Sequence, residues 1–172
     1  MALVVGSNEI TSALFGYGAF DILSVSNSAK ALYYFALGLP AFAIIKVFST
    51  FLFARGNTKS PFYYSFISVL INISISVIFF KDIGFIIIPI ATTISSWINV
   101  LLLFSKLYIN DYFKLKNILS ISNLKIIVIS IISISLFQIF INLLSEYLVY
   151  DSELKLFTII ALVIITIFIY IL

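Results

Sequence analysis

The sequence predicts an all-α membrane protein with about five transmembrane helices. Of its 172 residues, 63% are hydrophobic and 10% are charged, whereas soluble domains carry about 25% charged residues. The mean hydropathy is +1.24. A soluble chain of this length buries one core, which cannot hide several separate apolar runs of membrane-spanning length. The bilayer is therefore the expected solvent.

Five apolar runs are each long enough to cross a hydrocarbon core of about 30 Å as a helix rising about 1.5 Å per residue. They are residues 31–53, 62–80, 84–105, 126–144 and 156–172. Stretches such as IIALVIITIFIYIL are apolar throughout, unlike the alternating segments of a transmembrane barrel. A helix also satisfies its own backbone polar groups in lipid.

Polar segments between the runs divide the chain into four parts. We expect residues 1–28 to hold the end of a truncated preceding helix and an outward-facing loop, and residues 29–106 to form three transmembrane helices. Residues 107–124 are expected to form a cytoplasmic loop, which either lies along the membrane as an amphipathic segment or is an ordinary loop. Residues 125–172 are expected to form two C-terminal transmembrane helices.

The distribution of basic residues predicts the orientation, because Lys and Arg concentrate in cytoplasmic loops. One side of the predicted topology carries six of them, and the other side carries three. The six are Arg55, Lys59, Lys106, Lys114, Lys116 and Lys125, and the three are Lys30, Lys81 and Lys155. The C-terminus is therefore expected to be cytoplasmic. In this interpretation Arg55 and Lys59 set the topology and attract anionic headgroups.

The residue types that are missing narrow the function. The chain has no Cys and no His, so a thiolate or imidazole metal site and a nucleophile with a histidine base are excluded. We expect no enzyme activity, no metal and no cofactor. The sequence also carries no nucleic-acid signature.

Lys46 is the only charged residue within the five runs. It lies eight residues before Ala54, roughly 12 Å along a helix. A lysine at the centre of a membrane costs about 2.5–3.5 kcal/mol on insertion scales. Two interpretations stay open at this point. In one the side chain snorkels toward the interface, and in the other it faces a wet cavity that receives an anionic group.

Three of the runs repeat small polar residues at helical spacing, which places those residues on one face of each helix. We interpret these faces as sites of interhelical hydrogen bonds, in preference to the lining of a cavity. The sets are Ser65, Ser68, Asn72 and Ser76; Thr92, Ser95, Ser96 and Asn99; and Ser135, Gln138, Asn142 and Ser145. Pro40 and Pro89 are expected to kink their helices, and Gly16-Tyr17-Gly18 is expected to form a turn.

Four motifs resemble the family of bacterial lipid II flippases called MurJ or MviN. They are LFGYGAF (14–20), ALGLPAFAIIKV (36–47), FARGNTKSP (53–61) and IATTISSWINVLLL (90–103). The resemblance is carried by motifs to about Lys106 and by hydropathy beyond it. It implies the C-terminal part of a fourteen-helix, MATE-like transporter of the MOP superfamily, with residues 29–106 in its second bundle and the five runs as its tenth to fourteenth helices.

The resemblance also implies a function. Members of this family move an undecaprenyl-linked peptidoglycan precursor from the cytoplasmic to the periplasmic leaflet of the bacterial inner membrane by alternating access, in cell wall biogenesis and the maintenance of cell shape. The implied partners are this lipid substrate, membrane lipids and the missing N-terminal half, so the fragment alone is expected to be inactive. Two alternatives are a polysaccharide-lipid or drug exporter of the same superfamily and a small non-transporting membrane assembly subunit.

Overall fold

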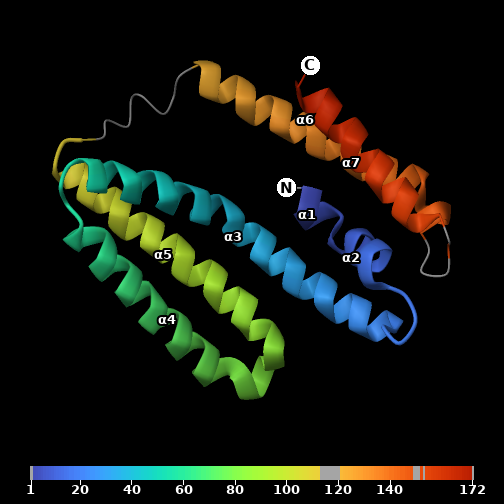
Figure 1. The fold of residues 1–172 in the computed structure, drawn as a ribbon, viewed down its shortest axis with the longest axis horizontal. Coiled ribbons are helices and arrows are strands. Elements are labelled where there is room, and N and C mark those ends of the chain that lie inside the picture. Colours follow the sequence, from blue (N-terminus) through green and yellow to red (C-terminus); the bar gives the residue numbers. More distant parts are fainter. Residues whose placement is uncertain (1, 113–120, 149–151, 153, 172) are drawn as a thin grey trace. The chain divides into compact units, whose positions relative to one another are not determined.

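The computed structural model describes residues 2–112, 121–148, 152 and 154–171, and every regular element in these residues is a helix (Figure 1). This confirms the all-α prediction. The α-helices are α1 (Ala2–Val5), α2 (Ser7–Phe15), α3 (Ile22–Ala54), α4 (Lys59–Ile83), α5 (Ile87–Ile109), α6 (Ile121–Leu143) and α7 (Lys155–Ile171). Two short 3-10 helices, η1 (Gly84–Ile86) and η3 (Ser145–Leu148), complete the set.

Two segments of the described chain are long and apolar enough to cross a membrane, namely Ile22–Ala54 and Lys59–Ile109. The second has 51 residues, and it folds back on itself at η1, so that α4 and α5 run in opposite directions (Figure 1). The apolar stretches Val128–Leu143 and Lys155–Phe168 are shorter. The five predicted runs thus correspond to α3, α4, α5, α6 and α7.

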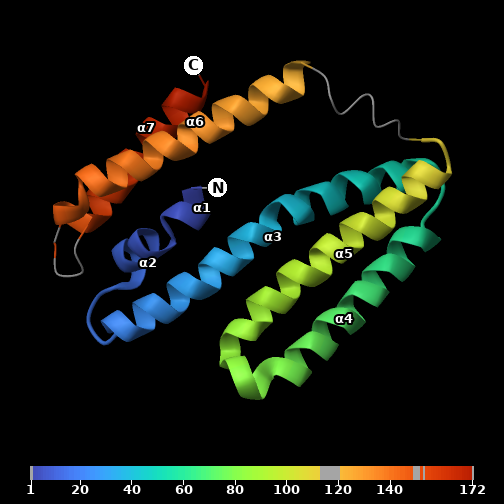
Figure 2. The ribbon, with the colours of Figure 1, turned by 180° about the vertical axis from the view of Figure 1, so that it is seen from behind.

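The chain divides into two compact units. We call Tyr34–Leu115 the central unit, and Met1–Tyr33 together with Lys116–Leu172 the terminal unit. The central unit holds most of α3 together with α4 and α5, and the terminal unit holds α1, α2, the start of α3, α6 and α7. In Figure 2 the blue N-terminal helices and the orange and red C-terminal helices belong to the terminal unit, which is therefore formed by the two ends of the chain.

In the central unit, α3 and α5 approach closely at Gly38. The Thr93 hydroxyl donates a hydrogen bond of 2.6 Å to the Tyr34 carbonyl, and the Trp97 indole N–H donates one of 3.2 Å to the Leu37 carbonyl. A Cβ atom built at Gly38 would lie 2.9 Å from Thr93 Oγ1. Glycine at this position therefore lets side chains of α5 reach the backbone of α3.

α3 begins at Ile22, nine residues before the predicted run that it contains. The polar residues that follow Ile22 suggested a loop, but Asp21 caps the helix by accepting a 2.8 Å hydrogen bond from the backbone N–H of Ser24. The hydrogen bonds from Ser24, first from its side chain and then from its backbone, lower the pKa of Asp21. The turn predicted at Gly16-Tyr17-Gly18 lies just before this cap, with Gly18 at φ +59°.

The two prolines differ in their positions. Pro40 lies inside α3, which continues through it. Pro89 is the third residue of α5, where a helix has no intrahelical use for the backbone N–H that proline lacks. The prediction that Pro89 kinks its helix is therefore wrong, because the reversal occurs earlier, at Gly84 with φ +74°.

The terminal unit has an apolar core formed where α2, α6, η3 and α7 meet. Phe137 is fully buried at its centre. The buried cluster comprises Ala13, Phe137, Ile141, Leu148, Ile159 and Leu162. Gly6 separates α1 from α2, and a Cβ atom there would lie 2.9 Å from the Phe137 ring. The core thus joins the first and last elements of the chain.

Candidate functional site

A line of hydrogen-bonded polar side chains joins α4 to α5. Asn72 Nδ2 donates to Thr92 Oγ1 over 3.0 Å and to Ser95 Oγ over 3.3 Å. Nearer the other end of the helices, Asn99 Nδ2 donates to Ser65 Oγ over 3.4 Å. We call these five residues the α4–α5 polar seam. The seam confirms the prediction of interhelical hydrogen bonds for these two helices.

The same polar seam also lines a pocket of about 450 Å³. Phe42 and Ile45 of α3 contribute its apolar wall, and all five seam residues contribute polar groups. Asn99 Oδ1 is buried and accepts no hydrogen bond from any residue that the structure describes. The two interpretations of the polar faces, as hydrogen-bonding sites and as cavity lining, therefore both apply to α4 and α5.

Lys46 is a neighbour, along α3, of the two α3 residues that line this pocket. It follows Ile45 directly and comes one helical turn after Phe42, and residues four apart lie on the same side of a helix. The side chain is exposed, and within the described residues its ammonium group has no hydrogen-bond or ion-pair partner. Its backbone carbonyl accepts the Thr50 hydroxyl at 2.8 Å. A cation is thus available at the edge of the helix face that lines the pocket.

Arg55, predicted as a topology-setting loop charge, also contacts two aromatic rings. Its guanidinium carbon lies 5.3 Å from the centroid of the Phe51 ring and 4.8 Å from that of Tyr112. The two rings meet edge to face, with centroids 5.9 Å apart. Arg55 therefore connects the end of α3 to the residues after α5 through cation–π contacts. The other predicted loop charge, Lys59, is exposed at the first position of α4.

The loop between α3 and α4 is held by local hydrogen bonds. Asn57 Oδ1 accepts the backbone N–H of Ser60 at 3.1 Å, and its Nδ2 donates to the Ser60 hydroxyl at 2.9 Å. Asn57, the residue before the N-cap Thr58, thereby pairs a backbone N–H of the first turn of α4. Gly56 has φ +74°, a conformation that favours glycine at the end of a helix. The motif FARGNTKSP is therefore a helix stop followed by a helix start.

Lys155 is a buried cation whose contacts the sequence did not reveal. It was expected to be an outward loop charge, yet it is only 2% exposed. Its Nζ donates a 2.6 Å hydrogen bond to the Gly16 carbonyl and lies 4.1 Å from the centroid of the Tyr17 ring. We call this contact the Lys155 clamp. It fastens the turn between α2 and α3 to the first residue of α7.

The polar face predicted on α6 has a different environment. Ser135, Gln138 and Asn142 are all exposed. The Ser135 hydroxyl donates to the Ile131 carbonyl of its own helix at 3.0 Å. Within the described residues these side chains form no hydrogen bond to another helix, so the interhelical interpretation is not confirmed for α6.

Comparison with known proteins gives a consistent result. Residues 1–167 match the family model described as lipid II flippase MurJ. The lipid II flippase MurJ of Thermosipho africanus (strain TCF52B) is 32% identical over 161 residues, which are 88% of this chain and 33% of that protein.

Two shorter matches carry the name probable lipid II flippase MurJ. The one from Rhizobium meliloti (strain 1021) is 38% identical over 106 residues, or 62% of this chain and 20% of that protein. The one from Rickettsia prowazekii (strain Madrid E) is 33% identical over 103 residues, or 60% and 20%. The chain thus spans a fifth to a third of these relatives. The family match also continues well beyond Lys106, further than the motifs indicated.

The Lys155 clamp predicts how substitutions of Tyr17 affect stability. Replacing Tyr17 with Leu removes the ring and should destabilise the purified protein by about 1 kcal/mol, lowering the melting temperature in detergent. Replacing it with Phe keeps the ring and should have a much smaller effect. In a Lys155→Met background the two Tyr17 variants should have the same melting temperature. Equal melting of both variants in the native background would contradict the clamp.

Proposed function

We propose, on the premise that this chain belongs to the lipid II flippase MurJ family, that it supplies the C-terminal part of a flippase for a lipid-linked peptidoglycan precursor. The family match carries this proposal, because it covers residues 1–167 of 172. The relatives that match are three to five times longer than the matched region. We propose that the transporting protein also contains an N-terminal half, which provides the first bundle of helices.

The proposed activity is movement of lipid II from the cytoplasmic to the periplasmic leaflet by alternating access, with no chemical reaction on the substrate. The family is named for a flippase and not for a catalytic activity. A flippase must accept a polar headgroup in a region where the lipid would otherwise meet only hydrocarbon. The α4–α5 polar seam and its pocket supply uncharged hydrogen-bonding groups in such a region.

Lys46 adds the positive charge that an anionic headgroup requires. Its position at the edge of the α3 face that lines the pocket supports the cavity interpretation over simple snorkelling. A lysine in contact with lipid is costly, and a wet cavity between two bundles removes that cost. We infer that Lys46 faces this cavity in the complete protein and helps to hold the pyrophosphate of the substrate or its counter-ion.

The proposed location is the bacterial inner membrane, with the C-terminus in the cytoplasm. The bias of basic residues toward the loops after α3 and α5 supports this orientation. It places the loop between α3 and α4 in the cytoplasm and η1 on the periplasmic side. Arg55 and Lys59 then lie at the cytoplasmic interface, where their charges attract anionic lipid headgroups.

Growth of cells depleted of their own flippase tests the function. A fusion of this chain to the N-terminal part of a lipid II flippase MurJ relative should restore growth, whereas the 172-residue chain alone should not, because a cavity between two bundles needs both. Membrane levels of the two proteins are compared by immunoblotting. Rescue by the short chain alone, or failure of the well-expressed longer protein, would contradict the proposal.

Substitution of Lys46 tests its contact with the substrate. A charge-assisted contact contributes about 1.5–3 kcal/mol, so Lys46→Gln should lower transport roughly tenfold or more at normal membrane levels. Lys46→Arg preserves the charge and should retain part of the activity. Lys59→Gln is the matched control and should complement growth. If Lys46→Gln complements as well as the unsubstituted protein, Lys46 is a snorkelling residue.

Cysteine labelling tests the orientation. Thr58 and Asp82 are exposed positions at opposite ends of α4, and this chain has no native cysteine. In a longer protein cleared of other cysteines, Asp82→Cys should react with an impermeant thiol reagent in intact cells, and Thr58→Cys should react only after the membrane is permeabilised. The reverse pattern would show that the orientation is inverted.

A further inference from the structure

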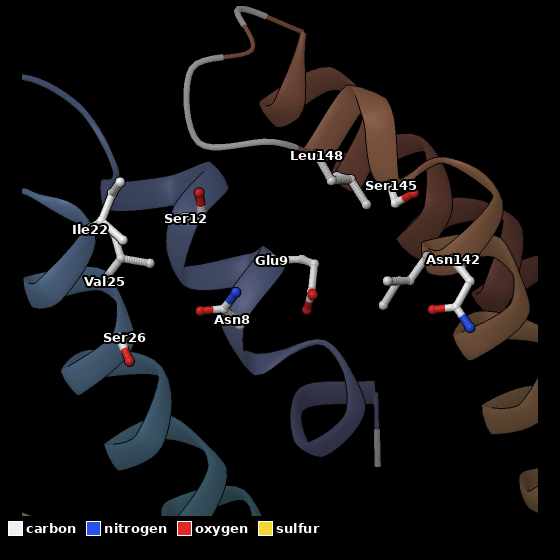
Figure 3. Close-up of a pocket in the computed structure, with 10 residues that line it drawn as sticks. Asn8, Glu9, Ser12, Ile22, Val25, Ser26, Asn142, Ser145 and Leu148 are labelled. Atoms are coloured by element: carbon white, nitrogen blue, oxygen red, sulfur yellow. The ribbon is translucent and has the colours of Figure 1, made fainter.

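A second pocket, of about 300 Å³, lies within the terminal unit between α2, the start of α3, the end of α6 and η3 (Figure 3). Its polar lining comes from Asn8, Glu9, Ser12, Ser26, Asn142 and Ser145, and the rest of its wall is apolar. Figure 3 shows Glu9 on the side of α2 that faces α6, where Asn142 lies. We call it the terminal pocket.

Ser12 is the most informative residue of this lining. It is 6% exposed, and its hydroxyl has no hydrogen-bond partner among the described residues. Other hydroxyls in these helices bond the carbonyl four residues earlier, as Thr11 does with Ser7 at 2.7 Å and Ser68 does with Tyr64 at 2.9 Å. A buried polar group without a partner is costly. The Ser12 hydroxyl is therefore a buried group in the wall of the terminal pocket that lacks a hydrogen-bond partner among the described residues.

The charges of the lining restrict the kind of ligand. Among the residues that the structure describes, no Lys or Arg lines the terminal pocket, so this lining has nothing to neutralise a phosphate. Glu9 is the one carboxylate in the described part of its lining, and the described residues hold no group of three His, Cys, Asp or Glu side chains that could bind a metal ion. The carboxamides and hydroxyls each donate and accept hydrogen bonds, and sugar hydroxyls do the same.

We propose that the terminal pocket binds an uncharged, hydroxyl-rich group of about monosaccharide size. Its volume is at the lower end of the ~300–1,000 Å³ typical of ligand pockets. Glu9 and the carboxamides accept and donate to the hydroxyls, Ser12 gains its missing partner, and the apolar wall packs against the C–H face of the ring. Binding of a sugar at the terminal pocket does not depend on the proposed transport function. Only the source of the sugar rests on that function, because the sugar is either a free saccharide or the saccharide part of a lipid-linked substrate.

Saturation-transfer NMR on the purified longer protein in detergent, with glucose as the probe, tests the site. The unsubstituted protein should give a transfer signal. Asn142→Leu replaces a lining carboxamide with an apolar group and should abolish the signal, whereas Gln138→Leu, also an exposed position, one turn earlier on α6 and outside the pocket lining, should leave it intact. No signal with the unsubstituted protein, or equal signals from both Leu variants, would overturn the proposal.

Ser12→Ala separates a binding role from a structural one. It should weaken glucose binding roughly threefold to tenfold, as loss of one neutral hydrogen bond does, without lowering the melting temperature, because the hydroxyl has no described partner to lose. A lower melting temperature with unchanged binding would overturn the assignment. So would displacement of glucose by equimolar inorganic phosphate or methylammonium, because the site would then select for charge.

Growth complementation identifies the source of the sugar. If Asn142→Leu abolishes glucose binding and also growth, the ligand is the saccharide of the transported lipid. If it abolishes binding while growth continues, the ligand is a free saccharide. Glucose binding by a protein that fails to complement at all would support the terminal pocket and contradict the proposed transport function.

Discussion

The structure depends on one constraint, which is that polar groups surrounded by hydrocarbon must find partners inside the protein. α3 shows the constraint most clearly, because Pro40 withdraws a backbone donor from the middle of the helix. In a regular helix that donor would bond the Ala36 carbonyl. On either side of Ala36, Trp97 donates to the Leu37 carbonyl and Thr93 donates to the Tyr34 carbonyl. The absence of a side chain at Gly38 allows this approach. The positions of α3 and α5 follow from these contacts.

The same constraint explains how much of the fold was predictable. Continuous apolar runs are needed to cross a membrane, so hydropathy alone predicted the cores of α3, α4 and α5. Their ends were less visible. The start of α3 is polar and resembled a loop, although Asp21 followed three residues later by Ser24 is a recognisable cap. The kink predicted at Pro89 was wrong because the predicted run began at Gly84, whereas α5 begins at Ile87 and holds Pro89 in its first turn.

The contacts of Lys155 and Arg55 could not be predicted, because they join residues that lie far apart in the sequence. Lys155 is a lysine between two acidic residues and an apolar run, which is typical of a loop charge. Only the folded chain brings it to the Gly16 carbonyl and the Tyr17 ring. Arg55, at the end of α3, likewise meets Tyr112, which follows α5. The polar faces of α4 and α5 were predicted because helical spacing is a local property, and their pairing as Asn72 with Thr92 follows from a short hairpin.

The Lys155 clamp joins residues 139 positions apart, and this separation constrains the order in which the chain assembles. The bonds between α4 and α5 span 20 to 34 residues, so the hairpin closes with a small loss of chain entropy as soon as both helices exist. The terminal unit has to wait until synthesis reaches α7. Until then the turn after α2 and the Gly16 carbonyl lack their lysine, which makes the unfinished terminal unit the segment most exposed to misassembly and to quality-control proteases.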